Sequence, residues 1–324
     1  MLRTTAALLF VLACSCGQVR HLRTDDGLRR DYRVHTPAGW DGESALPVVL
    51  VFHGGGGNAE GTQVNVGMDA AADAHGFLAV YPDGVGQKVL GTELNTWNGE
   101  YCCGVAQEQG VDDVAYVDQL LDALAARYPI DPARVFATGI SNGGIMSHML
   151  ACNLPERIAA IAPIASPGPP PSCAADTPVA VQIIHGTDDP CALYDGGDEC
   201  GGCWSRVIEQ VTGREVEDTD LFPCASVPDQ VALWRVANGC TEESAVTYQQ
   251  GAATCVQYSD CASGRPVSLC SIEGGGHSWP GTDLACDPET EWCTAYADVT
   301  GSISQDLDAN EIMWAFFSEN PMPE

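Results

Sequence analysis

The chain has 324 residues, 45% of them hydrophobic and 7% aromatic, so it can bury a sizeable core and is too apolar for a disordered protein. Acidic residues outnumber basic ones by 44 to 14, and the formal net charge is −30. A surface this negative repels nucleic acid and anionic membranes, so we expect no nucleic-acid partner. We expect a monomer.

The N-terminus is typical of an export signal. Arg3 precedes a short apolar run, residues 6–13, which is too short to cross a bilayer as a helix. The run ends at Val11-Leu12-Ala13-Cys14, which is similar to a bacterial lipobox that would place a lipid anchor on Cys14. Leu12 is not the small residue usual there, and an ordinary cleavage site is the alternative. We expect residues 1–20 to be a signal peptide of the lipoprotein type and residues 21–324 to form one domain, extracellular or at a bacterial cell surface.

The cysteines predict a disulfide framework. Fourteen of the sixteen lie from Cys102 onward, an even number in a chain that is expected to be exported. Cys200 and Cys203 have the CxxC spacing of some zinc and redox sites, but no second CxxC or HxxxH lies nearby. We therefore predict disulfides and no metal site. Residues 191–225 are rich in cysteine and weakly periodic, which indicates an insertion or cap held by short closed loops.

Apolar runs of strand length alternate with helical patterns along the chain. The expected strands are 32–35, in an antiparallel edge, then 46–52, 77–81, 134–140, 158–165, 179–184, short ones near 246 and 256, and 267–272. The expected helices are 68–75, 114–128, one from about 142, 227–237 and 312–317. This alternation predicts an α/β fold with a mostly parallel central sheet flanked by helices. No linker, repeat or separate binding module interrupts it.

A G-x-S-x-G motif, Gly139-Ile140-Ser141-Asn142-Gly143, lies between an expected strand and an expected helix. The glycines allow a turn so tight that a β-carbon on either side would clash. Such a turn places the serine hydroxyl at the end of the sheet and at a helix N-terminus, which favours developing negative charge. We predict that Ser141 is a nucleophile; an ordinary glycine-rich turn is the alternative.

His53 and the four glycines 54–57 follow the strand expected at 46–52. A tetrahedral intermediate needs two backbone N–H groups directed at its oxygen, and glycine allows the backbone to approach closely. We assign the two donors of this oxyanion hole to the amides of Gly55 and Asn142, ahead of Gly54 or Gly56. The alternative is a flexible surface loop.

A carboxylate and a histidine follow two later strands. Either Asp188 or Asp189 could accept the N–H of an imidazole, and their spacing alone does not choose between them. His277 lies in a glycine-rich loop after the last strand, so it completes the chain order Ser, Asp, His of an α/β-hydrolase and is predicted to be the general base. We expect His148 to pack below the turn at Ser141.

Residues 306–310 imitate the start of a calcium-binding loop, with Asp306, Asp308 and Asn310 at alternate positions. Glu311 replaces the required glycine and Phe317 the final glutamate, so we predict no calcium site. We expect the aspartates to cap the last helix.

Together these segments resemble the polyhydroxybutyrate depolymerase and feruloyl esterase group of α/β hydrolases, allied to carbohydrate esterase family one. The resemblance covers about residues 30–318. It rests on the segments RDYRVHTP, VFHGGGGNAEG, TWNGEYCCG, RVFATGISNGGIMSHMLACNLPERIAAIAPIAS, IHGTDDP, ALWRVANGC and IEGGGHSWPG. It implies an α/β-hydrolase catalytic domain. The disulfide-rich insertion departs from the shorter family pattern, between Cys191 and Cys224. The resemblance also implies that Asp189, directly before the proline, is the acid, and that Trp279 shapes the wall of the substrate site.

The resemblance also implies two disulfide bridges. They would join one of the adjacent pair Cys102 and Cys103 to Cys152, and Cys240 to Cys261.

The function expected from these residues is that of a secreted serine esterase that works through an acyl-enzyme and needs no metal or organic cofactor. The resemblance implies feruloyl or acetyl esters of plant polysaccharide as substrates. Polyhydroxybutyrate oligomers are the first alternative, and a peptidase is a third option. From a different class, an inactive surface-anchored binding protein could use the same scaffold. The intact Ser141, Asp189 and His277 favour an enzyme over a binding protein.

Overall fold

The computed structural model describes residues 18–89, 92–215, 221–284 and 286–323. Most of the expected export signal, including Cys14, lies outside these ranges. Residues 18–20 of that segment lie in strand β1 (Gln18–Arg23), which pairs with β2 (Arg29–His35). Within the described ranges, none of the helices combines the length and apolarity needed to span a membrane.

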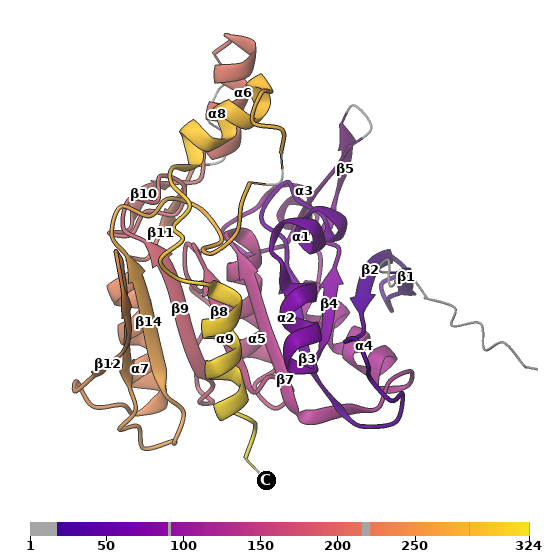
Figure 1. Ribbon diagram of the computed structural model, residues 1–324. Coiled ribbons are helices and arrows are strands. Elements are labelled where there is room, and N and C mark those ends of the chain that lie inside the picture. The colour runs from indigo at the N-terminus through magenta and orange to yellow at the C-terminus, as the bar shows by residue number, and fades with distance from the viewer. Residues whose placement is uncertain (1–17, 90–91, 216–220, 285, 324) are drawn as a thin grey trace, which may run out of the picture.

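A ten-stranded sheet with helices on both faces forms the centre of the molecule (Figure 1). Its strands lie in the order β1, β2, β4 (Leu78–Pro82), β3 (Leu46–Phe52), β7 (Ile130–Ile140), β8 (Ala160–Ile164), β9 (Ala180–Gly186), β14 (Val267–Ile272), β13 (Ala253–Tyr258) and β12 (Ala245–Gln250). The six strands from β4 to β14 run parallel, and the two strands at each edge pair antiparallel. The predicted mostly parallel sheet and its antiparallel edge at 32–35 are confirmed.

The residues of strand β3 explain why helices cover both faces of the sheet. All seven of its residues are buried, as expected for a strand between two helical layers. Val48, Leu50 and Phe52 belong to a core cluster with α4 (Asp113–Ala125), α5 (Asn142–Asn153) and α7 (Val227–Asn238). The alternate residues Val49 and Val51 belong to a second cluster with α2 (Met68–His75) and α9 (Ala309–Glu319). Two cores therefore hold the parallel strands from opposite faces.

Several elements lie beyond the carboxyl ends of the parallel strands, and of these the sequence predicted only the insertion at 191–225. These are α1 (Ala59–Asn65), the hairpin of β5 (Val85–Val89) and β6 (Thr92–Thr96), α3 (Gly104–Glu108), and a cap. The cap comprises β10 (Gly197–Cys200), α6 (Cys203–Thr212) and β11 (Phe222–Cys224), with α8 (Glu291–Thr300) beside α6 (Figure 1). The insertion expected at 191–225 is thus confirmed, with a helix that its short apolar pattern did not reveal.

The fourteen cysteines from Cys102 onward form seven disulfides. They join residues 102 and 103, 152 and 173, 191 and 203, 200 and 224, 240 and 261, 255 and 270, and 286 and 293. The preference for disulfides over zinc at Cys200 and Cys203 is confirmed, although these two cysteines pair with other partners. The expected bridge between Cys240 and Cys261 is also confirmed.

The bridge expected from Cys102 or Cys103 to Cys152 is wrong. Cys102 lies beside Asn142, the first residue of α5, whose side-chain nitrogen is 3.8 Å from the cysteine sulfur. Cys152 lies ten residues further along the same helix, or about 15 Å at 1.5 Å per residue. Because a disulfide requires its two Cα atoms within about 7 Å, the pair at the start of α5 cannot reach Cys152.

The last helix, α9, begins where the aspartate pattern ends. The carboxylate of Asp308 accepts hydrogen bonds from the amides of Asn310 and Glu311, at 2.9 and 3.2 Å, and so caps the helix as expected. Asp306 has another role, because its carboxylate accepts the amide of Ala252 at 2.8 Å. The two acidic groups thus bind backbone amides, one at the helix and one at a neighbouring strand end.

Candidate active site

Ser141 occupies a strained turn between β7 and α5. Its backbone lies at φ 58° and ψ −121°, a region that residues other than glycine rarely adopt. A β-carbon on Gly143 would lie 2.3 Å from the carbonyl oxygen of Phe52, and one on Gly139 would lie 2.6 Å from the carbonyl group of Gly143. The predicted tight turn is therefore present, and both flanking glycines are sterically required.

The predicted acid and base follow two other parallel strands at the same edge of the sheet. Asp189 comes three residues after β9 ends, and His277 lies in the loop after β14. Backbone hydrogen bonds of 2.9 Å link the segments after neighbouring strands: Ser141 N to Ile164 O, Ala165 N to Ile184 O, and Thr187 N to Ile272 O. The fold thus brings the three predicted residues to one edge from positions far apart in the sequence.

Asp189 and His277 form a buried hydrogen-bonded pair. His277 Nδ1 lies 2.9 and 3.1 Å from the two carboxylate oxygens of Asp189. The same carboxylate accepts the amides of Cys191 and Ala192, each at 2.8 Å, and His185 Nε2 lies 3.3 Å away. The carboxylate is therefore fixed from several sides, and it holds Nδ1 of His277 as the donor so that Nε2 is left for another partner.

The electrostatics favour an ionised carboxylate at Asp189. Burial by itself would raise the pKa of Asp189, but the charge and hydrogen bonds of His277 and His185 outweigh it and hold that pKa well below its usual range. Asp188, the alternative acid, is exposed, and its amide donates to Gly275 O. Geometry therefore selects Asp189 as the partner of His277.

The amides assigned to the oxyanion hole are available. Within the described residues, no acceptor takes a hydrogen bond from the backbone N–H of Gly55 or of Asn142. The N–H of Gly56 instead donates to Asn95 O at 2.9 Å, which removes Gly56 as an alternative donor. A β-carbon on Gly55 would lie 3.7 Å from Cβ of Asn142, so the glycine loop lies against the start of α5. Gly55 and Asn142 remain the preferred donors.

The side chain of Asn142 has a second role that the sequence analysis missed. Its amide group accepts Trp97 N at 2.7 Å and donates to Trp97 O at 2.9 Å. The residue after the serine thus forms both hydrogen bonds with one peptide segment 45 residues earlier. No local pattern reveals such a contact, because it depends on where the 97–103 loop passes the start of α5.

His53 holds the glycine loop in place. Its Nδ1 lies 2.8 Å from Gly54 O, and its Nε2 accepts the amide of Gly84 at 2.9 Å, so the ring is neutral with its proton on Nδ1. Complete burial lowers the pKa of His53 to about 4. The indole of Trp97 also donates to His53 O at 3.0 Å. These contacts make His53 a structural support of the predicted oxyanion loop.

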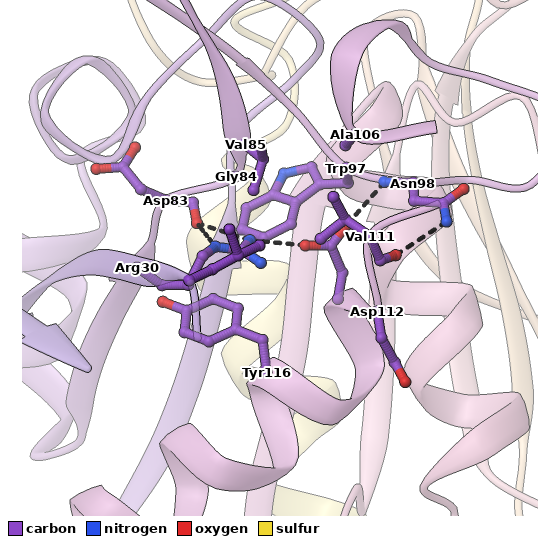
Figure 2. Close-up of polar contacts among 12 residues, drawn as sticks. Arg30, Asp83, Gly84, Val85, Trp97, Asn98, Ala106, Val111, Asp112 and Tyr116 are labelled. Carbon is purple, nitrogen blue, oxygen red and sulfur yellow. Dashed lines mark hydrogen bonds and ion pairs between the residues drawn. The ribbon is translucent and has the colours of Figure 1, made fainter. Parts of the chain in front are cut away.

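A buried arginine, Arg30, lies beside Trp97 and Tyr116 (Figure 2). Arg30 is 2% exposed, and its guanidinium pairs with the carboxylate of Asp113 at 2.6 Å and donates to Asp83 O at 3.0 and 3.3 Å. The guanidinium also lies 4.0 Å from the ring centre of Tyr116. This ion pair, between strand β2 and helix α4, is satisfied on several sides within the core.

The ion pair is connected to the 97–98 segment. The second oxygen of Asp113 accepts Asn98 N at 2.8 Å, and the side chain of Asn98 donates to Val111 O at 2.9 Å (Figure 2). Residues 97 and 98 are thus held by Asp113 on one side and by Asn142 on the other. Sequence reasoning did not identify Arg30, Asp113 or Asn98, because isolated polar and charged residues that contact distant segments give no periodic signal.

Two further residues near the motifs are core residues. Trp279 is 4% exposed, and its indole donates to Asn310 on α9 at 3.0 Å, within the second core cluster. Trp279 thus fixes the loop of His277 to α9, and its expected place in the wall of the substrate site stays a prediction. His148 is fully buried below the turn, as expected, and accepts the indole N–H of Trp234 at 3.1 Å.

Asp189, Cys191 and His277 also bring three ligand-type atoms within 4.8 Å of one another. The sulfur of Cys191 is bonded to Cys203, so it offers no thiolate. The carboxylate of Asp189 is already used by His277 and two amides. This donor set fits a hydrogen-bonded acid–histidine pair better than a metal site.

Three features define the protein as an α/β hydrolase: the strand order, the strained turn with positive φ at Ser141 between a parallel strand and a helix, and the acid–histidine pair after two later strands. Residues 27–265 match the Esterase family model, described as "Putative esterase". Because this match covers more than half of the chain, the chain belongs to the Esterase family, and it is a carboxylic ester hydrolase.

Curated relatives agree with this assignment. "Putative esterase NocK" from Nocardia uniformis subsp. tsuyamanensis is 30% identical over 264 residues, which cover 79% of this chain and 72% of the relative. "Bifunctional acetylxylan esterase/xylanase XynS20E" from Neocallimastix patriciarum is 27% identical, over 82% of this chain and 33% of the relative. "Feruloyl esterase B" from Piromyces equi is 29% identical, over 76% of this chain and 42% of the relative. The chain thus spans less than half of the last two.

A further relative, "Poly(3-hydroxyalkanoate) depolymerase C" from Paucimonas lemoignei, is 31% identical over 58% of this chain and 42% of its own length. Among solved structures, an acetyl xylan esterase from Aspergillus awamori matches 86% of this chain and all of its own with a TM-score of 0.52 at 16% identity. Thermogutta terrifontis esterase 2 matches 95% of this chain and 96% of its own, with a TM-score of 0.53 at 14% identity. These structures show the same fold.

Proposed function

We propose that the protein hydrolyses carboxylic esters through a covalent acyl-enzyme on Ser141, with His277 as general base and Asp189 as the acid that orients it. The observation that carries this proposal is the buried Asp189–His277 pair, 2.9 Å between carboxylate and Nδ1. The strained turn of Ser141 at the same sheet edge supports it.

In the proposed reaction, Ser141 Oγ attacks the ester carbonyl carbon while His277 Nε2 takes the hydroxyl proton. The carbonyl oxygen becomes an anion that accepts hydrogen bonds from the amides of Gly55 and Asn142. The bond to the alcohol then breaks, and His277 returns the proton to the leaving oxygen. Water attacks the acyl-enzyme by the same steps in reverse and releases the acid. Within the described residues the Ser141 hydroxyl forms no hydrogen bond, so we expect its contact with His277 to close when an ester binds.

The substrates we propose are feruloyl or acetyl esters of plant polysaccharide. The relatives named feruloyl esterase and acetylxylan esterase, at 29% and 27% identity over more than three quarters of this chain, support this class. Hydrolysis of polyhydroxybutyrate oligomers is the alternative, and the 31% identical relative named poly(3-hydroxyalkanoate) depolymerase supports it over a shorter match.

We further propose that the protein is exported by an N-terminal signal of the lipoprotein type, residues 1–20, and works as a monomeric domain of residues 21–324. The seven disulfides support an oxidising compartment, because thiols in the cytosol are kept reduced.

The test is hydrolysis of p-nitrophenyl acetate, p-nitrophenyl butyrate and methyl ferulate by the oxidised protein and by Ser141→Ala. We expect turnover by the wild type and none by Ser141→Ala. The ester that the wild type prefers then distinguishes acetyl, hydroxyalkanoate and feruloyl esters as the substrate class. If the wild type cleaves no ester, the inactive binding protein replaces the enzyme as the better description.

A further inference from the structure

Two exposed tryptophans stack on each other at the surface of the cap. The ring centres of Trp204, on α6, and Trp292, on α8, lie 5.7 Å apart with 25° between the ring planes. Trp204 is 40% exposed and Trp292 is 41% exposed. Tryptophan is highly buried on average, and adjacent exposed apolar side chains indicate an interaction site more than single ones do, so an exposed stacked pair on two different helices is a candidate binding surface.

The pair is attached to the proposed oxyanion loop. The indole Nε1 of Trp204 donates to Gly55 O at 2.6 Å, and a β-carbon on Gly56 would lie 3.0 Å from the same indole. The amide of Gly55 is one of the two proposed oxyanion donors. The aromatic surface therefore begins one peptide group away from the position proposed for the reacting carbonyl.

Disulfides fix both tryptophans. Trp204 follows Cys203, which is bonded to Cys191, and the amide of Cys191 holds the carboxylate of Asp189. Trp292 precedes Cys293, which is bonded to Cys286. Each ring thus lies next to a covalent crosslink in the chain, and one of those crosslinks leads directly to the proposed catalytic acid. A binding surface held in this way loses little conformational entropy when a ligand arrives.

The surroundings of the pair favour a flat, uncharged and apolar ligand. Ile208, 40% exposed, lies one helical turn after Trp204, so the face of α6 continues as apolar surface. Tyr296, one turn after Trp292 on α8, lies 6.3 Å from Trp204. The net charge of −30 disfavours an anionic ligand. Aromatic rings bind such surfaces by offset stacking, as these two indoles already do.

We propose that Trp204 and Trp292 bind the planar ring of an aromatic acyl group, of the hydroxycinnamoyl class, and so select aromatic over short aliphatic esters. This inference rests on the proposed ester hydrolysis and names the part of the substrate that the cap recognises. It also gives the cap a role at the site.

The test compares methyl ferulate with methyl butyrate, an ester without a ring, by titrating the released acid. The variant is Trp292→Ala, because Trp292 stacks in the pair whereas Trp204 also holds Gly55. We expect kcat/KM for methyl ferulate relative to methyl butyrate to fall about tenfold, mainly through a higher KM. Val236→Ala, an 82% exposed residue on α7, is the control and leaves the ratio unchanged.

An unchanged ratio in a folded Trp292→Ala variant would overturn the proposal. The proposal would also be overturned if Trp292→Ala lost activity only toward an acetylated xylo-oligosaccharide, because the surface would then bind sugar. A second measurement separates this inference from the proposed function: binding of methyl ferulate to Ser141→Ala, followed by tryptophan fluorescence. Binding that weakens about tenfold in Ser141→Ala/Trp292→Ala supports the aromatic surface even if the wild type proves inactive, and equal binding by both proteins contradicts it.

Discussion

Arg30 and Asp113 form an ion pair of 2.6 Å whose side chains are 2% and 0% exposed, and the pair supports the segment that contacts Asn142. Removal of one partner leaves the other charge buried without compensation, which costs about 3–5 kcal/mol. We therefore expect Arg30→Met to lower the free energy of unfolding by several kcal/mol, measured by urea denaturation. The control is Arg29→Met, whose pair with Asp31 is 60% and 37% exposed and should change stability by less than about 1 kcal/mol. Equal effects of the two variants would contradict this role.

The turn at Ser141 should not tolerate a side chain at Gly143. A β-carbon there would lie 2.3 Å from Phe52 O, so strand β3 or helix α5 must shift. We expect Gly143→Ala to abolish turnover and to destabilise the fold by more than about 1 kcal/mol. Gly61→Ala, inside α1 and with its nearest atom at 3.5 Å, should instead stabilise slightly because alanine is the better helix former. Activity and thermal unfolding of both variants decide the point.

The choice of Asp189 over Asp188 is testable by paired substitutions. We expect Asp189→Asn to lower kcat by about 10⁴-fold, because the amide no longer stabilises the protonated imidazole, and Asp188→Asn to retain most activity. The pKa of Asp189 is lowered in the folded state, so its contribution to stability is complete above the ordinary carboxyl pKa and is lost as the pH falls through and below about 4. The difference in free energy of unfolding between wild type and Asp189→Asn, measured with urea, should shrink as the pH falls through and below about 4. Loss of activity in Asp188→Asn alone would reverse the assignment.

His53 should make the fold acid-sensitive. Its pKa is about 4 in the folded protein, below its ordinary value of 6.5, so the unfolded chain takes up a proton first as the pH falls. Stability should therefore decrease between pH 6.5 and 4, by roughly 3 kcal/mol from this group. We expect His53→Gln to be less stable than wild type at neutral pH and to lose less stability over the same interval. Exposed His21→Gln is the control. Parallel pH profiles for wild type and His53→Gln would exclude this role.

Much of the site follows from local sequence. Part of the steric demand is local, because a β-carbon on Gly139 would lie 2.6 Å from the carbonyl group of Gly143, and the motif therefore predicts the turn that carries Ser141. The close contact of Gly143 is with Phe52 O on strand β3, which only the fold brings near. The buried strands end where their apolar runs end, and parallel strands bring their carboxyl ends to one edge. The order Ser141, Asp189, His277 along the chain could therefore be translated into a single site before any contact was known.

Only the tertiary structure decided the remaining features, because each depends on two segments that are distant in sequence. The hydrogen bond to His277 selects Asp189 over its neighbour, and the length of α5 separates Cys152 from the pair at 102 and 103. Trp279 lies two residues after His277 in the sequence, but in the fold its side chain packs in the core. The sequence by itself determined the parallel strands of the central sheet, the presence of the turn and the residue types of the site, since these follow from local sterics and periodicity. Most of the disulfide partners and the aromatic surface on the cap required the packed fold, since no local pattern encodes which distant segments meet. The residues alone left Asp188 and Asp189 open, and the fold supplies the contact that distinguishes them.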